Sequence, residues 1–299
     1  MKTPVAFLIF NRPDTTEKVF EAIRQAKPPK LLVVADGPRP DRPGEAEKCQ
    51  AAREIIKQVD WDCEVLTNYS DVNLGCKKRV ASGLDWVFEN VEEAIILEDD
   101  CLPHPTFFPF CEELLDKYRD DNRIMTISGD NFQFGKTRNK DSYYFSRYNH
   151  CWGWASWRRA WQHYDIEMKN WEKVRDEGWL KDIFCDSSSV KYWENIFQRT
   201  YEGKIDTWDY IWTYCCWLQN GLTILPNVNL VSNIGFGNEG THTKSKKNIF
   251  ANIPAEEMRF LLQHPSFVIR NEKADSLTQR TLFYKPIILI RLIKKLGII

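Results

Sequence analysis

The chain has 299 residues, enough for one large catalytic domain or two small ones with a substantial core. Its 41 basic and 42 acidic side chains nearly cancel, so no overall positive field favours a nucleic-acid partner. Nine scattered cysteines without a CxxC pair indicate reduced thiols in a cytoplasmic protein, not zinc ligands. The apolar run near the N-terminus is too short for a signal segment or a membrane span, so we expect the protein not to be exported.

Short apolar runs without alternation predict strands that are buried on both faces of a parallel sheet. They lie at 5–10, 31–35 and 94–97, and polar or turn residues follow each of them. A helix start at Pro13-Asp14 and an apolar stripe at Val80, Leu84, Val87 and Phe88 predict helices between the strands. Further strands are predicted at 64–67 and 123–128. The predicted fold class is therefore α/β, a single Rossmann-like domain with a mostly parallel, doubly wound central sheet.

From about Gly129 the alternation of strands and helices fades, and the chain becomes rich in aromatic residues and loops. A helix is predicted around 190–201, and short strands at 222–225 and 229–232 lead into a glycine-rich stretch at 235–240. This half is expected to be loop-rich.

Three adjacent acids follow the third buried run of the chain. Ile95-Ile96-Leu97 leads directly into Glu98, Asp99 and Asp100, and ligands of open α/β sheets bind beyond the carboxyl ends of the strands. Neighbouring carboxylates repel one another unless a cation or hydrogen-bond donors offset the repulsion. A hard divalent ion held by one or two carboxylates and by phosphate oxygens fits such a group. The alternative is a solvated acidic turn, but the position at a strand end favours the metal.

Two further candidates follow the first two predicted strands. Asp36 ends the second one, where its carboxylate can accept a hydrogen bond from a ribose hydroxyl or a base N–H. A simple Asp-Gly turn with Gly37 explains the same residue equally well. Arg12, in Asn11-Arg12-Pro13 after the first strand, is a candidate to lie beside a nucleotide.

The order of these motifs resembles that of the N-acetylglucosaminyltransferases that begin hybrid and complex N-glycans. The resemblance runs from about residue 4 to 243, is most specific from Glu98 to Phe108, and also covers Cys76-Lys77-Lys78-Arg79. The chain is similar as well to bacterial HlpA-like nucleotide-sugar transferases. The resemblance implies an A-type glycosyltransferase (GT-A) fold and inverting transfer from a UDP-sugar. It also implies manganese, or magnesium, bridging the pyrophosphate to Asp100.

The same resemblance implies roles for the other candidates. Asp99 and Glu98 would contact ribose and sugar hydroxyls, Arg12 and Asp36 would lie at the uridine, and Arg79 or Lys78 would lie near the diphosphate. It also implies a catalytic domain at 1–245, with a nucleotide-sugar-binding half at 1–128 and an acceptor half at 129–245. A C-terminal extension follows at 246–299.

In the acceptor half, Cys151-Trp152 and Gly153-Trp154 are similar to a family segment that lines the sugar and acceptor cleft. A tryptophan face can cover the apolar side of a pyranose, whereas a packed helix is the alternative, since Trp154, Trp157 and Trp161 have helical spacing.

Inversion needs a general base for the acceptor hydroxyl. The family places an acid after a tryptophan at the position of Thr207-Trp208-Asp209-Tyr210, which makes Asp209 the candidate, with Asp206 in reserve. The family has a doubled acid there, and this chain has one acid followed by Tyr210, so the register stays open. An N-cap of a helix at 210–217 is the alternative for Asp209.

Two segments near the C-terminus complete the candidates. The glycine-rich stretch and His242 are similar to a family loop that orders over the donor, where His242 would touch the diphosphate or the metal; a solvated loop histidine is the alternative. Residues 286–299 form a basic amphipathic pattern, which is typical of a segment that lies on the inner surface of the membrane, near a lipid-linked acceptor. A helix docked on the domain or a dimer contact explains the same pattern slightly better.

The leading hypothesis is thus an inverting, metal-assisted glycosyltransferase that uses a UDP-sugar and a glycan, lipid-linked or other hydroxyl acceptor. One alternative is a catalytically silent protein that binds carbohydrate or nucleotide. Another is a sugar-phosphate nucleotidyltransferase, which is disfavoured because no glycine-rich phosphate motif with a following basic residue lies near the first strand.

Overall fold

The structure is a computed structural model that describes residues 1–236, 250 and 253–283. His242, the end of the glycine-rich stretch and the tail at 286–299 lie outside the described residues. Among those described, no helix is long and apolar enough to cross a membrane.

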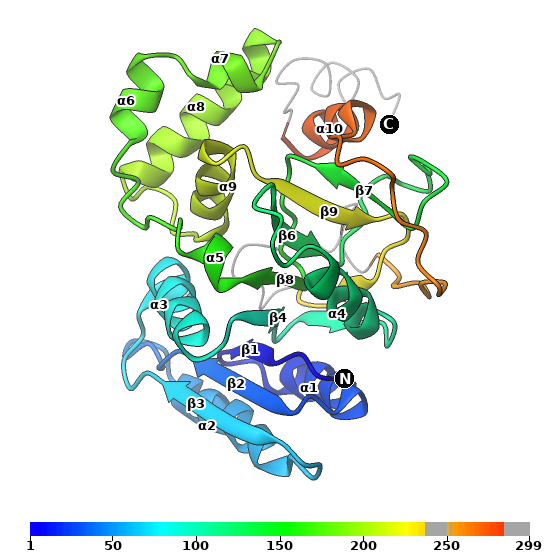
Figure 1. Cartoon of the computed structure of the whole chain (residues 1–299). Coiled ribbons are helices and arrows are strands. Elements are labelled where there is room, and N and C mark those ends of the chain that lie inside the picture. Colours follow the sequence, from blue (N-terminus) through cyan, green and yellow to red (C-terminus); the bar gives the residue numbers. More distant parts are fainter. Residues whose placement is uncertain (237–249, 251–252, 284–299) are drawn as a thin grey trace, which may run out of the picture.

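An eight-stranded sheet forms the centre of the molecule (Figure 1). Its order is β3-β2-β1-β4-β8-β6-β9-β7. The pairs β1–β2, β2–β3, β1–β4 and β6–β9 are parallel, whereas β8 is antiparallel to β4 and β6, and β7 is antiparallel to β9. The strands are β1 (Val5–Ile9), β2 (Lys30–Ala35), β3 (Glu64–Tyr69), β4 (Glu93–Glu98), β6 (Ile124–Ser128), β7 (Tyr143–Ser146), β8 (Trp154–Trp157) and β9 (Leu222–Pro226). The predicted fold class, one α/β domain with a mostly parallel central sheet, is confirmed.

Helices cover both faces of this sheet, as the unalternated strands require. Along β1, Val5, Phe7 and Ile9 pack into one core layer, while Ala6 and Leu8 pack into the other. The first layer receives α1 (Pro13–Ala26), α2 (Glu45–Ile55) and α4 (Phe107–Lys117). The second receives α3 (Gly75–Asn90), α5 (Arg158–Trp161), α6 (Trp171–Asp176), α7 (Leu180–Ile183), α8 (Ser187–Tyr201) and α9 (Asp209–Leu218). A short turn, η1 (Ile56–Gln58), follows α2.

The tryptophan-rich segment differs from its helical alternative. Trp154–Trp157 forms the buried strand β8, and only Arg158–Trp161 is helical. Trp154 stacks on Trp208 with ring centroids 5.5 Å apart, and Trp161 lies 5.1 Å from Trp212. These rings fill the second core layer, so the helical spacing of the tryptophans was a coincidence of a strand followed by a helical turn.

A two-stranded sheet lies beside the end of β4. It pairs β5 (Cys101–Pro103) with β10 (Val231–Asn233) in antiparallel fashion. The strand predicted at 229–232 therefore begins two residues later and belongs to this small sheet. The pairing brings the residues before the glycine-rich stretch next to the three adjacent acids.

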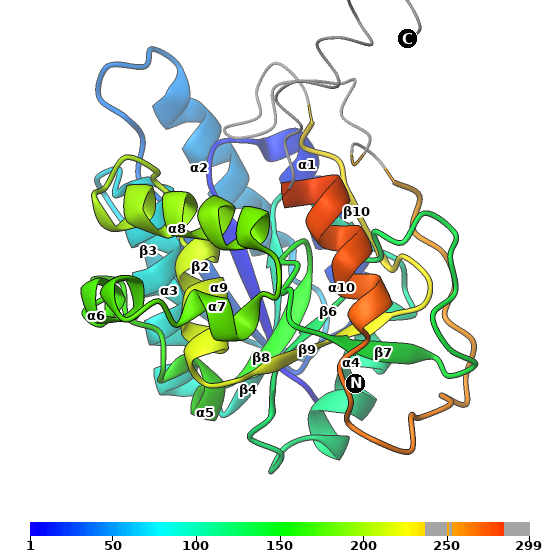
Figure 2. The same cartoon turned by 90° about the horizontal axis from the view of Figure 1, so that it is seen from above.

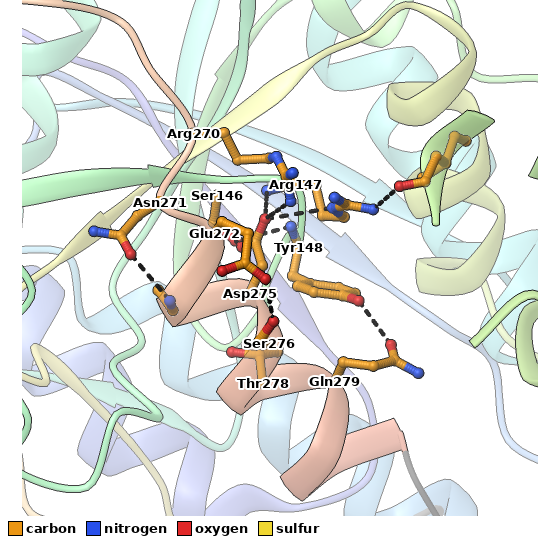
Figure 3. Close-up of polar contacts among 12 residues, drawn as sticks. Ser146, Arg147, Tyr148, Arg270, Asn271, Glu272, Asp275, Ser276, Thr278 and Gln279 are labelled. Carbon is orange, nitrogen blue, oxygen red and sulfur yellow. Dashed lines mark hydrogen bonds and ion pairs between the residues drawn. The ribbon is translucent and has the colours of Figure 1, made fainter. Parts of the chain in front are cut away.

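The described part of the C-terminal extension docks on β7 through α10 (Glu272–Thr278), which Figure 2 shows from above. The short π-helix η2 (Gln279–Phe283) follows and contacts α8. Figure 3 shows the buried carboxylate of Asp275, which accepts hydrogen bonds from Ser146 Oγ at 2.6 Å and from Arg270 NH1 at 2.8 Å. Arg147 Nε lies 3.4 Å from the same carboxylate. These contacts join the extension to the edge of the central sheet.

Candidate active site

The carboxyl ends of β1, β2, β4 and β6 point to the same edge of the sheet, because these four strands run in one direction. The residues directly after them include Arg12, Asp36, the acids Asp99 and Asp100, and Asp130. This edge is where ligands bind in open α/β sheets.

Arg12 forms the centre of this edge. Its NH1 lies 2.6 Å from Asp100 Oδ2, and its NH2 contacts Asp99 Oδ1. Asp99 Oδ2 also accepts a hydrogen bond from the backbone N–H of Phe10 at 3.1 Å. Burial lowers the pKa of the Arg12 guanidinium, but Asp99 and Asp100 outweigh burial and leave the pKa above its usual value. One guanidinium therefore neutralises part of the charge of two buried carboxylates.

Glu98 is the acid of this group that no arginine holds. No hydrogen bond to its side chain is found among the residues that the structure describes. Burial, followed by repulsion from Asp100 and Asp99, raises the pKa of Glu98 to about 8. Burial also raises the pKa of Asp99, to about 6, although Arg12 opposes that shift. The strand end thus holds more acid than one arginine balances, as the sequence predicted for three adjacent carboxylates.

Asp36 lies at the same edge with its acceptor positions filled. Its Oδ1 accepts from the N–H groups of Gly37 and Leu74, both at 2.9 Å. Its Oδ2 accepts from Gly75 N and Asn73 Nδ2, both at 3.1 Å. Burial raises the pKa of Asp36, and the backbone N–H groups oppose that shift. A carboxylate offers about four acceptor positions, so Asp36 in this state closes the turn and holds the start of α3.

Arg79 is also engaged by the protein itself. Its Nε donates to the carbonyl of Ala35 at 3.1 Å, and its NH2 donates to Asn68 Oδ1 at 2.8 Å. The guanidinium is buried, which lowers its pKa. These bonds tie the ends of β2 and β3 together, whereas Lys78 on the same helix is exposed.

Asp209, the first residue of α9, lies close enough to Glu98 to contribute to the raised pKa of that acid. Its Oδ1 accepts from Thr207 Oγ1 and from the N–H of Tyr210, the latter at 2.9 Å. Its Oδ2 has no partner within the described part of the chain. The N-cap position of α9 is Trp208, so the alternative that placed Asp209 at the N-cap is wrong.

Asp206 points elsewhere. Its Oδ1 accepts from the N–H of Lys77 at 3.3 Å, near the start of α3. A Cβ at Gly75 would lie 3.0 Å from its Oδ2. The loop before α9 is thereby fastened to the nucleotide half of the chain.

Gly235 passes directly over the ion pair of Arg12. A Cβ at this position would lie 2.0 Å from Asp100 Oδ2 and 2.7 Å from Arg12 NH1. The N–H of Ile234 donates to the Asp100 carbonyl at 2.8 Å. Only glycine allows the chain to approach the carboxylate this closely. The beginning of the glycine-rich stretch therefore forms one wall of the site.

One acid of this edge was missed by sequence reasoning. Asp130 follows β6, is fully buried, and accepts from the N–H of Trp152 at 3.1 Å through Oδ2. Burial raises the pKa of Asp130 well above its usual range, and its Oδ1 has no partner among the described residues. The predicted strand at 123–128 carried the signal, because an acid directly after a buried strand was the rule that singled out Glu98.

Trp152 lies partly buried beside this acid, unlike the core tryptophans. Its ring contacts Phe132 edge-on at 5.2 Å and Phe236, next to Gly235, at 5.5 Å. Of the two tryptophans considered for the cleft, Trp152 packs against the site, whereas Trp154 is buried in the core.

The donor set at the strand end suits a hard divalent cation, which prefers carboxylate oxygens. Among the described residues, the hydrogen-bond donor found at Asp100 Oδ1 is the thiol of Cys101, at 3.5 Å, so this oxygen lacks a strong donor there. No group of three His, Cys, Asp or Glu side chains arranged for a metal is found in the described ranges. A cation at Asp100 would therefore take its remaining ligands from substrate and water.

No protein-family model and no curated protein matches this sequence. Among solved structures, mouse xyloside xylosyltransferase 1 is similar at 9% identity and a TM-score of 0.35, over 71% of this chain and 81% of that one. The 4-diphosphocytidyl-2C-methyl-D-erythritol synthase of Anaerococcus prevotii is similar at 11% identity and a TM-score of 0.36, over 66% and 97%.

A UDP-glucose pyrophosphorylase bound to UDP-glucose is similar at 12% identity and a TM-score of 0.28, over 49% of this chain and 62% of that one. This chain thus spans less than two thirds of the pyrophosphorylase. The similar structures include sugar-transferring and nucleotidyl-transferring enzymes, but likenesses this weak carry no argument about the activity of this chain.

Proposed function

We propose that the protein is a metal-assisted, inverting glycosyltransferase that moves a sugar from a UDP-sugar to a hydroxyl of a glycan, a lipid-linked sugar or a similar acceptor. The observation that carries the proposal is the strand-end group of Glu98, Asp99 and Asp100, with Asp209 close enough to contribute to the raised pKa of Glu98. The proposed metal ligand Asp100 and a partly exposed acid, Asp209, then belong to one site. The resemblance of the motifs to the N-acetylglucosaminyltransferases supports the same assignment.

In this proposal Asp100 holds the manganese or magnesium ion, whose Lewis acidity stabilises the charge that develops on the departing diphosphate. Asp99 and Glu98 accept hydrogen bonds from ribose and sugar hydroxyls, and Arg12 contributes a guanidinium to the nucleotide. Asp36 and Arg79 serve the nucleotide by holding the loop before α3 and the ends of β2 and β3, given the hydrogen bonds that already occupy them.

Asp209 is the proposed general base. The acceptor oxygen attacks the anomeric carbon, the bond from that carbon to the diphosphate oxygen breaks with its electron pair, and Asp209 takes the hydroxyl proton. Thr207 and the Tyr210 N–H fix Oδ1, which leaves Oδ2 for the acceptor. Asp206 is the second candidate for this role.

Two parts of the proposal rest on residues outside the described ranges. His242 is proposed to contact the diphosphate or the metal. The tail at 286–299 is proposed to contact an anionic membrane surface. Removing 286–299 should reduce co-sedimentation with anionic liposomes, and unchanged binding would exclude the membrane contact.

The proposal is tested by calorimetric titration of UDP with and without Mn²⁺. We expect the wild type to bind UDP only with the metal, and Asp100→Ala to lose that binding. Asp209→Asn should keep UDP binding and lose about 10²–10⁴-fold in transfer rate, the usual contribution of a general base. The same loss in Asp206→Asn, with Asp209→Asn active, would reassign the base. UDP binding that is indifferent to metal and to Asp100→Ala would overturn the proposed donor site.

A further inference from the structure

The two acids that pair with Arg12 differ in their other hydrogen-bond donors. Asp99 is held twice, by Arg12 NH2 and by the N–H of Phe10 at 3.1 Å. Asp100 Oδ2 has Arg12 NH1 at 2.6 Å, and within the described ranges Asp100 Oδ1 has only the Cys101 thiol, at 3.5 Å. If the guanidinium moves, Asp99 keeps a backbone donor and Asp100 keeps no strong donor among the described residues. Arg12 therefore controls the availability of Asp100 Oδ2.

The guanidinium also occupies the space that a cation at Asp100 needs. Gly235 lies against Asp100 Oδ2 and Arg12 NH1, so close that a Cβ at this position would collide with both atoms. A divalent ion that approached Oδ2 would meet an arginine nitrogen already within hydrogen-bond distance, in a buried setting where like charges repel strongly. The cation and Arg12 cannot both hold this oxygen in the observed geometry.

A diphosphate offers Arg12 a different partner. The planar guanidinium matches phosphate oxygens in a two-pronged geometry at least as well as it matches carboxylates. Arg12 could transfer its hydrogen bonds from Asp100 to the phosphates and leave the carboxylate for the cation. Asp100 would then have a positive charge beside it in both states.

We propose that Arg12 gates the cation site: it blocks Asp100 Oδ2 in the free protein and releases this oxygen when a nucleotide diphosphate binds. This inference rests on the proposed function, since it takes the metal nucleotide as the ligand. Its consequence is that nucleotide and cation bind cooperatively. By linkage, each strengthens the binding of the other by the same factor.

The test measures Mn²⁺ binding by the electron paramagnetic resonance signal of the free ion, without nucleotide. We expect Arg12→Gln to bind Mn²⁺ about tenfold or more tightly than the wild type, within the usual range of coupling between sites. Arg39→Gln is the matched control, because Arg39 is a nearby arginine that pairs with Glu45. It should bind Mn²⁺ as the wild type does. Adding UDP should strengthen Mn²⁺ binding in the wild type more than in Arg12→Gln.

Two further variants keep the test decisive. Arg12→Lys retains a charge but has no fork to bridge two acids, so it should bind Mn²⁺ with intermediate affinity and covers the case in which Arg12→Gln does not fold. Asp100→Ala should abolish the gain when combined with Arg12→Gln. Equal or weaker Mn²⁺ binding by folded Arg12 variants would overturn the gate.

The gate and the proposed function fail in different ways. If the wild type binds UDP with Mn²⁺ but the Arg12 variants gain no affinity for Mn²⁺ alone, the gate is wrong and the donor site stands. If the Arg12 variants gain Mn²⁺ affinity but UDP never binds, Arg12 does block the cation. The nucleotide is then not the ligand that releases Asp100 Oδ2, and the proposed UDP-sugar donor is wrong.

Discussion

Replacing Gly235 by alanine should damage the site by steric contact alone. The new Cβ would lie 2.0 Å from Asp100 Oδ2 and 2.7 Å from both Arg12 NH1 and Asp100 Cγ, whereas real Cβ contacts essentially never fall below 3.0 Å. The carboxylate or the loop must therefore shift by about 1 Å. Overpacking of this kind typically destabilises the folded protein by about 1–3 kcal/mol. The Asp100 carboxylate is hard to move, because it is paired with Arg12, and Arg12 is itself paired with Asp99.

We expect Gly235→Ala to lower the free energy of unfolding by about 1–3 kcal/mol. The same displacement of Asp100 should weaken the binding of UDP with Mn²⁺ by about 5–150-fold, at 1.4 kcal/mol for each factor of ten. Denaturant unfolding and calorimetry measure the two effects. Gly203→Ala is the control: Gly203 has a φ of 69° with open space around it, so the variant should lose about 1 kcal/mol of stability through backbone strain and keep its UDP affinity. Wild-type UDP affinity in Gly235→Ala would refute the close approach.

Three further predictions concern groups away from that contact. Burial lowers the pKa of His150 from 6.5 to about 3, so its contribution to stability is fully present above pH 6.5 and is lost as the unfolded chain binds a proton below it, by about 2 kcal/mol at pH 5. Denaturant titrations above pH 6.5 and at pH 5 should show this loss of unfolding free energy in the wild type and not in His150→Phe, and the same loss in both proteins would contradict it. Asp36→Ala should lower the free energy of unfolding by about 2–4 kcal/mol, because it removes the acceptor of the buried Gly37 N–H and of the partly buried N–H groups of Leu74 and Gly75; a loss under about 1 kcal/mol would show that water replaces the carboxylate. Asp275→Asn should cost about 3–5 kcal/mol, because Arg147 and Arg270 would lose their buried anion, and an unchanged melting temperature would mean that α10 is not held by this pair.

The sequence predicted most of the sheet because its strands are buried on both faces. The runs at 5–10, 31–35 and 94–97 have no polar interruptions, which a parallel sheet between two helical layers demands, and they became β1, β2 and β4. The segment after Gly129 was harder, because its strands are short and antiparallel partners come from distant parts of the chain. Trp154 and Trp157 of β8 and Trp161 after it are three and four residues apart, as on one face of a helix, and only the pairing of β8 with β4 and β6 makes it a strand.

The placement of candidate residues at the sheet edge was also predictable, since it follows from the direction of parallel strands. What the sequence did not contain was the partner of each side chain. Arg12 was expected at the uridine and is found on Asp99 and Asp100. Asp36 was weighed between a ligand and a turn, and its four hydrogen bonds are those of a turn and a helix start. Such pairings depend on the register of neighbouring strands, which sets where each strand ends relative to the next, and local sequence patterns do not encode this register.

The position of Asp209 depends on both halves of the chain. The acid begins a helix packed in the second core layer, but the loop before it is fastened to the start of α3 through Asp206 and the Lys77 N–H. The start of α3 is held in turn by Asp36, which follows β2. A continuous series of short contacts therefore connects the end of β2 to the loop that leads into the proposed base. In each contact a carboxylate accepts from a backbone N–H, so the loop before Asp209 is fixed relative to the end of β2. A base and a donor site need such rigidity for in-line attack.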